Sequence, residues 1–263
     1  MSENITRSIS GLIYIILLIG ATLYSEWSYQ ILILSFLLIG IYEFSKLTDL
    51  PILKSFIIAI LPVLAIYFTQ SIIPFYYYNL FGVIILILLL IQLFQKNIDS
   101  QSKYLNYLFL IGYISIPFIT LLKIPLIDNK YEPRVIIGIF ILIWTNDTFA
   151  YLTGKSFGKN KLFERISPKK TIEGFLGGIL FTIIASLVIS YYFSFYNSII
   201  WISSAIFVSL FGTIGDLVES KFKRQANVKD SGKIMPGHGG ILDRLDSIIF
   251  VAPFLYLIFK TFQ

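Results

Sequence analysis

Nine long apolar runs, separated by short polar segments, dominate the pattern of hydrophobic and polar positions along the chain. Each is of the length that a helix needs to cross a hydrocarbon core of roughly 30 Å. The pattern therefore predicts an all-α, polytopic integral membrane protein with about nine transmembrane helices. The predicted spans are Ser10–Tyr24, Tyr29–Phe44, Ile52–Phe68, Tyr78–Phe94, Tyr104–Leu122, Val135–Leu152, Phe175–Tyr192, Ile199–Gly215 and Ile248–Phe262.

Basic residues lie mainly on one side of the predicted bilayer. An odd number of spans puts the two chain ends on opposite sides, and cytoplasmic loops of membrane proteins are enriched in Lys and Arg. With a cytoplasmic N-terminus, the 21 Lys and Arg residues would all face the cytoplasm except Lys123, Lys130, Arg134 and Lys260. This distribution predicts a multi-pass protein of the cell (inner, or cytoplasmic) membrane with a cytoplasmic N-terminus.

The chain has no linker, charged tail or repeat, so we expect a single membrane domain of residues 1–263. Within it we distinguish an N-terminal five-span region, residues 1–122, from a C-terminal catalytic region, residues 123–263, with cytoplasmic loops 153–174 and 216–247. The first region carries few charged groups. Its notable acid, Glu43, is interpreted as a helix-end residue that extends to the membrane interface.

Composition narrows the classes of function. Hydrophobic residues make up 56% of the chain and the mean hydropathy is +0.80, which exceeds what one soluble core could bury. The absence of cysteine excludes disulfides, thiolate metal sites and cysteine nucleophiles. The net charge of +6 is confined to short loops, which favours a membrane surface or phosphate-bearing partners over nucleic acid.

The first charge-rich loop follows the sixth predicted span. Asp147 lies about two turns inside that span, where a carboxylate is costly unless it is paired; a structural ion pair with a lysine of the loop and a direct functional role both stay open. In "SPKKTIEG", Ser167 or Thr171 is expected to cap the next helix. Lys169 and Lys170 are candidates for binding a lipid head group, although the positive-inside rule alone would also explain them.

The second charge-rich loop ends in "KDSGKIMPGHGGILDRLD" and has the side-chain chemistry of a phosphate site. Gly237, Gly239 and Gly240 allow backbone N–H groups to point at an anion, and the helix that follows adds the positive end of its dipole. Arg244 can bind a phosphate bidentately. His238, the only histidine, is expected to donate to a phosphate or leaving group, or to orient the loop. A simple glycine-rich re-entrant turn would not need these charged groups.

Carboxylates at the ends of the last two predicted spans suggest a metal site. Asp243 and Asp246 are three positions apart and so share one helical face. Asp216 follows Gly212 and Gly215, which permit close approach of a helix or ligand. Oxygen ligands in a protein without cysteine favour Mg²⁺ or Mn²⁺ over zinc. We therefore expect a metal-bound polyanion to be handled at the cytoplasmic surface, as when a nucleoside triphosphate meets a lipid phosphate.

The segment "SKFKRQANVKDSGKIMPGHGGILDRLD", Ser220 to Asp246, resembles the signature of the phosphatidate cytidylyltransferase family, also called CDP-diacylglycerol synthases. That signature has a serine, two residues, lysine-arginine, four residues and lysine-aspartate, followed by histidine-glycine-glycine and aspartate-arginine-x-aspartate. "DTFAYLTGKSFGKNKL" and "SPKKTIEG" also resemble this family, so the resemblance covers about the C-terminal half. Met235 stands where leucine, isoleucine or phenylalanine is expected, a small apolar change.

The resemblance implies an enzyme, a nucleotidyltransferase of phospholipid biosynthesis that converts CTP and phosphatidate into CDP-diacylglycerol and pyrophosphate. It implies Mg²⁺ as cofactor, with Mn²⁺ as an alternative and a monovalent ion as a further option, and a homodimer in the lipid bilayer. Because the attacking group is already an ionised phosphate monoester, no protein nucleophile or strong base is needed. The protein then has to align the substrates and neutralise charge.

The resemblance also implies roles for particular residues. Asp216 and Asp243 correspond to metal-binding acids, with Asp246 as a supporting acid. The groups expected at the reacting phosphates are Lys223, Arg224, Lys229, Asp230, His238 and Arg244. Further substrate-binding candidates are Ser167, Lys169, Lys170, Ser220, Gly237, Gly239 and Gly240.

Two other readings of the chain stay open. A transporter or channel would have ionisable groups near the bilayer midplane, whereas the charges here gather at one surface. A CTP-dependent polyprenol kinase or a CDP-archaeol synthase would share much of the site chemistry. The reaction products separate a polyprenol kinase from a cytidylyltransferase, because a kinase releases CDP and a cytidylyltransferase releases pyrophosphate.

Overall fold

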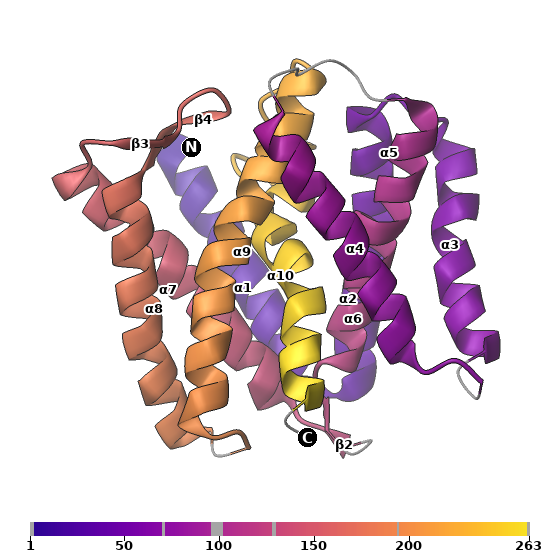
Figure 1. Ribbon diagram of the computed structural model, residues 1–263, viewed down its shortest axis with the longest axis horizontal. Helices are drawn as coiled ribbons and strands as arrows, with labels where there is room; N and C mark the ends of the chain where they lie inside the picture. Colours follow the sequence, from indigo (N-terminus) through magenta and orange to yellow (C-terminus); the bar gives the residue numbers. More distant parts are fainter. Residues whose placement is uncertain (1–2, 70–71, 96–101, 128–129, 194, 262–263) are drawn as a thin grey trace.

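The computed structural model describes residues 3–69, 72–95, 102–127, 130–193 and 195–261. Within these ranges, long helices run side by side between the two ends of the molecule (Figure 1). The pieces α5, the π-helical turn η1 and α6 are continuous and form one helix. The helices are α1 (Glu3–Tyr24), α2 (Glu26–Leu47), α3 (Ile52–Thr69), α4 (Phe75–Phe94), α5 (Lys103–Phe109), η1 (Leu110–Ser115), α6 (Ile116–Lys123), α7 (Pro133–Phe157), α8 (Ile172–Tyr192), α9 (Ser198–Gln225) and α10 (Leu242–Thr261).

The prediction of a polytopic, helical membrane protein is confirmed. In the described chain, seven helices are long and apolar enough to cross a membrane: α1, α2, α4, the continuous α5–α6 helix, α7, α8 and α9. The two other predicted spans correspond to α3, whose apolar part covers only Ile52–Ile66, and to α10, whose first turns carry Asp243, Arg244 and Asp246. The last residue of the ninth predicted span, Phe262, lies outside the described residues.

Two short antiparallel hairpins were not predicted. Strand β1 (Leu126–Ile127) pairs with β2 (Lys130–Tyr131), and β3 (Lys161–Phe163) pairs with β4 (Ser167–Thr171) at the other end of the molecule (Figure 1). Such short strands give no alternating pattern that a sequence could reveal. The second hairpin matters for function because β4 carries Lys169 and Lys170.

Polar side chains cap several helices as their sequences indicate. The Thr171 hydroxyl accepts a hydrogen bond from the Gly174 N–H at 3.1 Å and begins α8. Of the two predicted caps, Thr171 is therefore confirmed, and Ser167 lies in β4 instead. Asn197 caps α9 by accepting from the Ile200 N–H at 3.0 Å. These contacts satisfy N–H groups that have no partner within the helix.

Helix α10 lies in the middle of the bundle, against α9, α6, α4 and α2 (Figure 1). Its Phe254 stacks on Phe211 of α9, with ring centroids 4.0 Å apart. Close approach of the two helices depends on Gly215 of α9, because a Cβ there would lie 2.6 Å from the carbonyl oxygen of Asp246. This packing fixes α10 against α9 at the level of Asp216 and Asp246.

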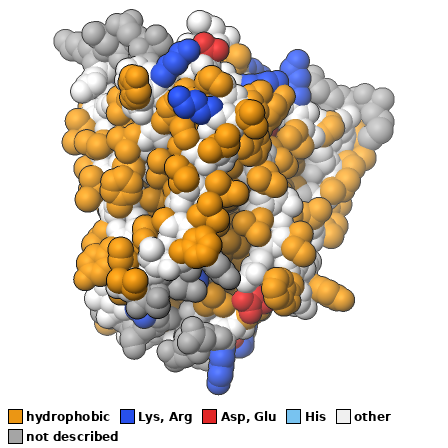
Figure 2. Space-filling model, turned by 90° about the vertical axis from the view of Figure 1, so that its right-hand side faces the viewer, with side chains coloured by type: hydrophobic (Ala, Val, Ile, Leu, Met, Phe, Trp, Pro, Cys, Tyr) orange, Lys and Arg blue, Asp and Glu red, His pale blue; other side chains and the backbone are white. Residues whose placement is uncertain are grey.

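The surface has the distribution expected of a protein in a bilayer. Figure 2 shows hydrophobic side chains over the middle of one face, with the blue and red charged groups gathered toward its two ends. Helices α1 and α8 expose large apolar residues, among them Leu12, Ile16, Leu176 and Leu180. Exposed apolar surface of this extent requires an apolar environment. The protein is therefore a multi-pass membrane protein.

One end of the molecule collects the segments that carry most of the polar chemistry. Strands β3 and β4, the end of α9 and the start of α10 lie there, and we call it the hairpin end. In Figure 1 the first described residues lie at the hairpin end, whereas the C-terminal end of the chain lies at the opposite end, beside β2. This arrangement agrees with the odd number of predicted spans.

Candidate functional site

The polar site is built where α9, α10, α7 and the β3–β4 hairpin meet. The sequence predicted a loop over 216–247, but α9 continues to Gln225 and α10 begins at Leu242, so the connection is only residues 226–241. Asp216, Ser220 and Lys223 therefore lie on a helix, and Asp243, Arg244 and Asp246 lie on the next. Two packed helices hold these side chains more rigidly than a loop would.

A cavity of about 480 Å³ opens between β4, α7, α9 and α10, and we call it the hairpin cavity. Lysines of the hairpin contribute cations, and carboxylates come from three helices. Its charged lining residues are Asp147, Lys155, Lys169, Lys170, Asp216, Asp243, Arg244 and Asp246. A concave site in which this many charged side chains converge is a candidate site for binding a charged ligand.

Asp216 and Lys170 form the clearest contact across the hairpin cavity. Lys170 Nζ lies 2.7 Å from Asp216 Oδ2, and both side chains are about one third exposed. The Ser220 hydroxyl donates to Asp216 Oδ1 at 3.3 Å. The structure thus brings together three predicted site residues from the two charge-rich loops.

Asp246 and Asp147 complete the acidic side of the hairpin cavity. Asp246 Oδ1 accepts from the Ser247 N–H at 2.6 Å, and Asp147 lies next to Asn146 on α7, with Asn146 Nδ2 donating to Asp147 Oδ1 at 3.4 Å. Of the two interpretations left open for Asp147, its place in the cavity lining favours a functional role. No ion pair of Asp147 is present among the described contacts.

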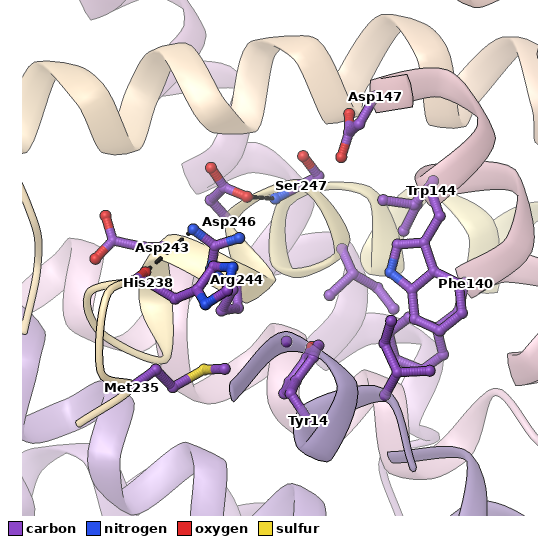
Figure 3. A pocket seen from close by; sticks show the side chains of 14 residues that line it. Tyr14, Phe140, Trp144, Asp147, Met235, His238, Asp243, Arg244, Asp246 and Ser247 are labelled. Carbon is purple, nitrogen blue, oxygen red and sulfur yellow. Dashed lines mark hydrogen bonds between the residues drawn. The ribbon is translucent and has the colours of Figure 1, made fainter. Parts of the chain in front are cut away.

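Asp243 points in a different direction from the other acids. Its Oδ1 accepts from Lys223 Nζ at 2.7 Å. Its Oδ2 accepts at 2.8 Å from each of three donors, the Ser231 N–H, the Ser231 hydroxyl and the Gly240 N–H. Figure 3 shows the Asp243 carboxylate turned away from Asp147. In the part of the chain that the structure describes, no three His, Asp or Glu side chains are grouped closely enough to hold a metal ion.

Lys223 lies between two buried acids. It contacts Glu219, one turn earlier on α9, as well as Asp243, and the exposed fractions of the Glu219, Asp243 and Lys223 side chains are 2%, 6% and 15%. Charges taken out of water in this way need close partners. Glu219 was missed by sequence reasoning, although an acid four positions before Lys223 on a helix was an available signal.

The connection between α9 and α10 is shaped by glycines with positive φ. Gly237 has φ of 75° and Gly239 has φ of 85°. Around them, the Met235 N–H donates to the Gly239 carbonyl at 2.9 Å, and the His238 N–H donates to the Met235 carbonyl at 2.9 Å. This turn delivers the Gly240 N–H to Asp243.

Replacing Gly239 by alanine is expected to disturb the turn and the Asp243 carboxylate together. A Cβ at Gly239 would lie 2.5 Å from Asp243 Oδ2, in a backbone conformation that costs a non-glycine residue about 1–2 kcal/mol. We expect at least a tenfold loss of the activity predicted from the sequence, an order-of-magnitude figure for a small misplacement at a site. The thermal unfolding temperature in detergent should fall by only a few degrees. A fully active Gly239→Ala variant would contradict this role of the turn.

A second, smaller cavity of about 250 Å³ lies between α1, α7 and the start of α10, and we call it the α1 cavity. Figure 3 shows Tyr14, Phe140 and Trp144 on one side and the polar groups His238, Arg244 and Asp246 on the other. Arg244 Nη2 donates to the His238 carbonyl at 3.1 Å. Asp147, Asp243, Arg244, Asp246 and Ser247 line both cavities, so the two spaces adjoin the same charged groups.

His238 is held by Ser10 of α1. Ser10 Oγ lies 2.7 Å from His238 Nδ1, 2.9 Å from the Pro236 carbonyl and 3.1 Å from the Arg7 carbonyl. Because a carbonyl can only accept, a hydroxyl proton directed at either carbonyl requires His238 Nδ1–H to donate to Ser10, whereas the other tautomer of His238 accepts this proton at Nδ1. The predicted loop-orienting hydrogen bond of His238 is therefore present, from a partner that the sequence did not indicate.

The single imidazole is expected to titrate below its ordinary pKa of 6.5. Partial burial, and then the positive charges of Arg244 and Arg7, lower the pKa of His238. The folded protein then binds this proton more weakly than the unfolded chain, so the contribution to stability is complete above pH 6.5 and declines as the pH falls toward the lower folded value. An NMR titration of the only histidine resonance checks this, and a midpoint above 6.5 would contradict it.

The other predicted residues divide into two groups. Lys169 lines the hairpin cavity, but Ser167 pairs with Phe163 in the hairpin. Arg224, Lys229 and Asp230 are exposed and are absent from the lining of both cavities. The interpretation of Glu43 is corrected: its exposed fraction is 1%, so it does not extend to the interface. Its side chain is buried against the first residues of α10.

Comparisons with known proteins identify the family of the chain. The pattern of the cytidylyltransferase family matches residues 5–262. A protein named phosphatidate cytidylyltransferase from Staphylococcus aureus (strain COL) is 51% identical over 135 residues, which are 49% of this chain and 52% of that protein. One of the same name from Staphylococcus saprophyticus is 43% identical over 179 residues, 65% of each chain.

The chain spans about half the length of the S. aureus relative, and the S. saprophyticus match also falls short of two thirds of that protein. The resemblance recognised in the signature is confirmed by these matches. Because the family pattern covers nearly the whole chain, the protein belongs to the cytidylyltransferase family.

Proposed function

We propose that the protein is a phosphatidate cytidylyltransferase, which converts CTP and phosphatidate into CDP-diacylglycerol and pyrophosphate. The observation that carries the proposal is the hairpin cavity, where Lys170 meets Asp216 at one end of a lipid-embedded helix bundle. The name of the relatives supports the same substrates. A phosphate oxygen of phosphatidate attacks the α-phosphorus of CTP, and the bond between the α-phosphorus and the bridging oxygen breaks to release pyrophosphate.

The protein's own residues align and neutralise the phosphates. Lys169, Lys170 and Arg244 supply fixed positive charge around the hairpin cavity, where a triphosphate would lie. The α1 cavity has aromatic walls and ends at His238 and Arg244, which suits a phosphate that is attached to acyl chains. The shared residue Arg244 would then meet both substrates. No side chain has to act as a nucleophile, because phosphatidate already carries the attacking oxygen.

The acids of the hairpin cavity have the donor chemistry for a divalent cation, although among the described residues no three of them are grouped closely enough to hold one in this structure. Asp216, Asp243 and Asp246 all line the hairpin cavity and offer only oxygen atoms, the donors that Mg²⁺ prefers. We propose these three residues as its holders, with Asp147 as a neighbouring acid; Asp243 would have to turn from Ser231 and Gly240 toward Asp216 and Asp246 to join them. Mn²⁺ could replace Mg²⁺ with the same ligands, and a monovalent ion could accompany it. When bound, the ion would neutralise phosphate charge.

The proposal includes the location of the enzyme and its orientation in the membrane. The hairpin end would face the cytoplasm, because CTP is water-soluble and most of the basic residues are predicted on that side. The protein would lie in the cell membrane as a homodimer, with phosphatidate arriving from the inner leaflet.

A test by products and acceptors separates this proposal from its nearest competitor. Purified protein would be incubated with Mg²⁺ and either CTP or dATP and, in separate reactions, with phosphatidate, archaetidic acid or a polyprenol. We expect pyrophosphate release that requires phosphatidate. Release of CDP with the polyprenol would identify a kinase, and activity with dATP but none with CTP would overturn the nucleotide assignment.

A further inference from the structure

A buried carboxylate on α2 contacts the functional segment directly. Glu43 lies in the last two turns of α2 and has an exposed fraction of 1%. Its Oε1 accepts from the Ile241 N–H at 3.1 Å, and its Oε2 accepts from the Leu242 N–H at 2.9 Å. It therefore binds both N–H groups where the 226–241 connection turns into α10.

Glu43 caps the N-terminus of α10 in place of a side chain from the neighbouring sequence. The first N–H groups of a helix have no partner within the helix, and a negative charge is favourable beside them. Here the acid comes from a helix about 200 positions earlier in the chain, since the contact to Leu242 joins residues 199 apart. The start of α10 is thereby fixed relative to α2.

Ser231 connects Glu43 to the predicted metal acid Asp243. Its hydroxyl lies 3.1 Å from Glu43 Oε2 and 2.8 Å from Asp243 Oδ2. The backbone also closes around Glu43, because a Cβ added to Gly232 or Gly240 would collide with its carboxylate. Glu43, Ser231, Gly240 and Asp243 thus form one buried network.

We infer that Glu43 is a positioning residue for the cytidylyl-transfer site. It lines neither cavity, so it acts through the network that orients Asp243 and the adjacent Arg244. The inference rests on the proposed function for its kinetic consequences. The ordering of residues 231–242 by Glu43 does not depend on which reaction the site performs.

The kinetic test compares two acids of the same helix. Glu43→Gln keeps the size of the side chain but loses the charge and one acceptor. Glu26→Gln makes the same change at the opposite end of α2, where Glu26 accepts from Gln30 Nε2 at 2.8 Å. We expect Glu43→Gln to lower kcat about 10- to 100-fold, with the KM for CTP within about twofold. Glu43→Asp should recover part of the rate, and Glu26→Gln should match wild type.

A labelling test reads the order of the segment without any activity. The natural chain has no cysteine, so Met235→Cys, at a position 8% exposed, provides a single thiol in the connection. Adding Glu43→Gln is expected to raise its alkylation rate at least about tenfold, the effect of losing charge-assisted hydrogen bonds. Ala205→Cys, at a fully buried position in α9, should stay protected in both backgrounds and so reports global unfolding.

The possible results separate the inference from the function. Wild-type kcat for Glu43→Gln together with an unchanged alkylation rate would overturn the inference. If wild-type protein transfers no cytidylyl group, the proposed function fails, and the labelling comparison still decides the role of Glu43. If Glu43→Gln does not fold, Glu43→Asp and Ser231→Ala replace it, and wild-type kcat and protection in both would overturn the inference.

Discussion

Replacing Asp216 by asparagine is expected to abolish cytidylyl transfer while leaving the fold intact. Asparagine keeps the shape and can still accept from Ser220, but it removes the negative charge that faces Lys170 at 2.7 Å. Because both side chains are about one third exposed, the lost ion pair costs only about 0–1 kcal/mol of stability. Loss of a charged group at reacting phosphates should lower the rate at least about 10²- to 10³-fold.

Steady-state rates of purified variants in detergent would measure this effect. Glu132→Gln provides the matched control, since Glu132 also forms an ion pair, with Arg134 at 2.7 Å, but lies beside β2 at the opposite end of the molecule. We expect the control to keep the wild-type rate. An Asp216→Asn variant with an unchanged rate would remove Asp216 from the site.

Replacing Lys223 by methionine is expected to be the most destabilising change at the site. Lys223 neutralises Glu219 and Asp243, whose side chains are 2% and 6% exposed, so its loss leaves two buried carboxylates without their shared cation. Breaking a buried ion pair by removing one partner costs about 3–5 kcal/mol. Transfer activity should be lost as well, because Asp243 loses the donor to its Oδ1.

Thermal unfolding in one detergent would check this prediction through a pair of variants. The double change Lys223→Met with Glu219→Gln should recover part of the stability, since it also removes one of the two stranded charges. The exposed Lys46, which lies over the Tyr42 ring, gives the control Lys46→Met, with an expected change within about 0.5 kcal/mol. Equal unfolding temperatures for wild type and Lys223→Met would contradict the stabilising role of Lys223 between the buried Glu219 and Asp243.

Much of the architecture was predictable because a bilayer imposes simple rules. Each apolar run had to be helical, since unpaired backbone groups are too costly in hydrocarbon, and the structure places a helix at each run. The β3–β4 hairpin could not be predicted, because its strands are short and its pairing depends on the turn between them. The extent of α9 was also underestimated: Asp216, Glu219 and Lys223 are polar, yet they continue the helix to Gln225.

The candidate site was predictable in its residues more than in its contacts. The signature contains Lys223, Asp243 and Arg244, the family resemblance added Asp216, and the structure brings these residues to adjoining positions on α9 and α10. It could not indicate that Asp243 would point toward Ser231 and Gly240, because that direction depends on the φ of Gly239. The contacts that distant helices make with the site also leave no pattern in the local sequence from which they could be predicted.

Ser10 and Glu43 illustrate the second difficulty. A serine in an apolar run and an acid near a helix end are each common in membrane proteins, and their local sequences suit ordinary surroundings. Only the packing of α1 and α2 against the connection 226–241 places Ser10 on His238 and Glu43 on α10. The N-terminal helices therefore contribute to the site through contacts that join residues about 200 positions apart.

The fate of the phosphorus atoms of CTP tests the central claim most directly. Wild-type protein in lipid vesicles would receive phosphatidate, Mg²⁺ and CTP labelled at either the α- or the γ-phosphorus, and the lipid and water-soluble products would be separated. The α-label should appear in the lipid and the γ-label in pyrophosphate, in equal amounts. Transfer of the γ-label to the lipid, or no label in the lipid at all, would contradict the account.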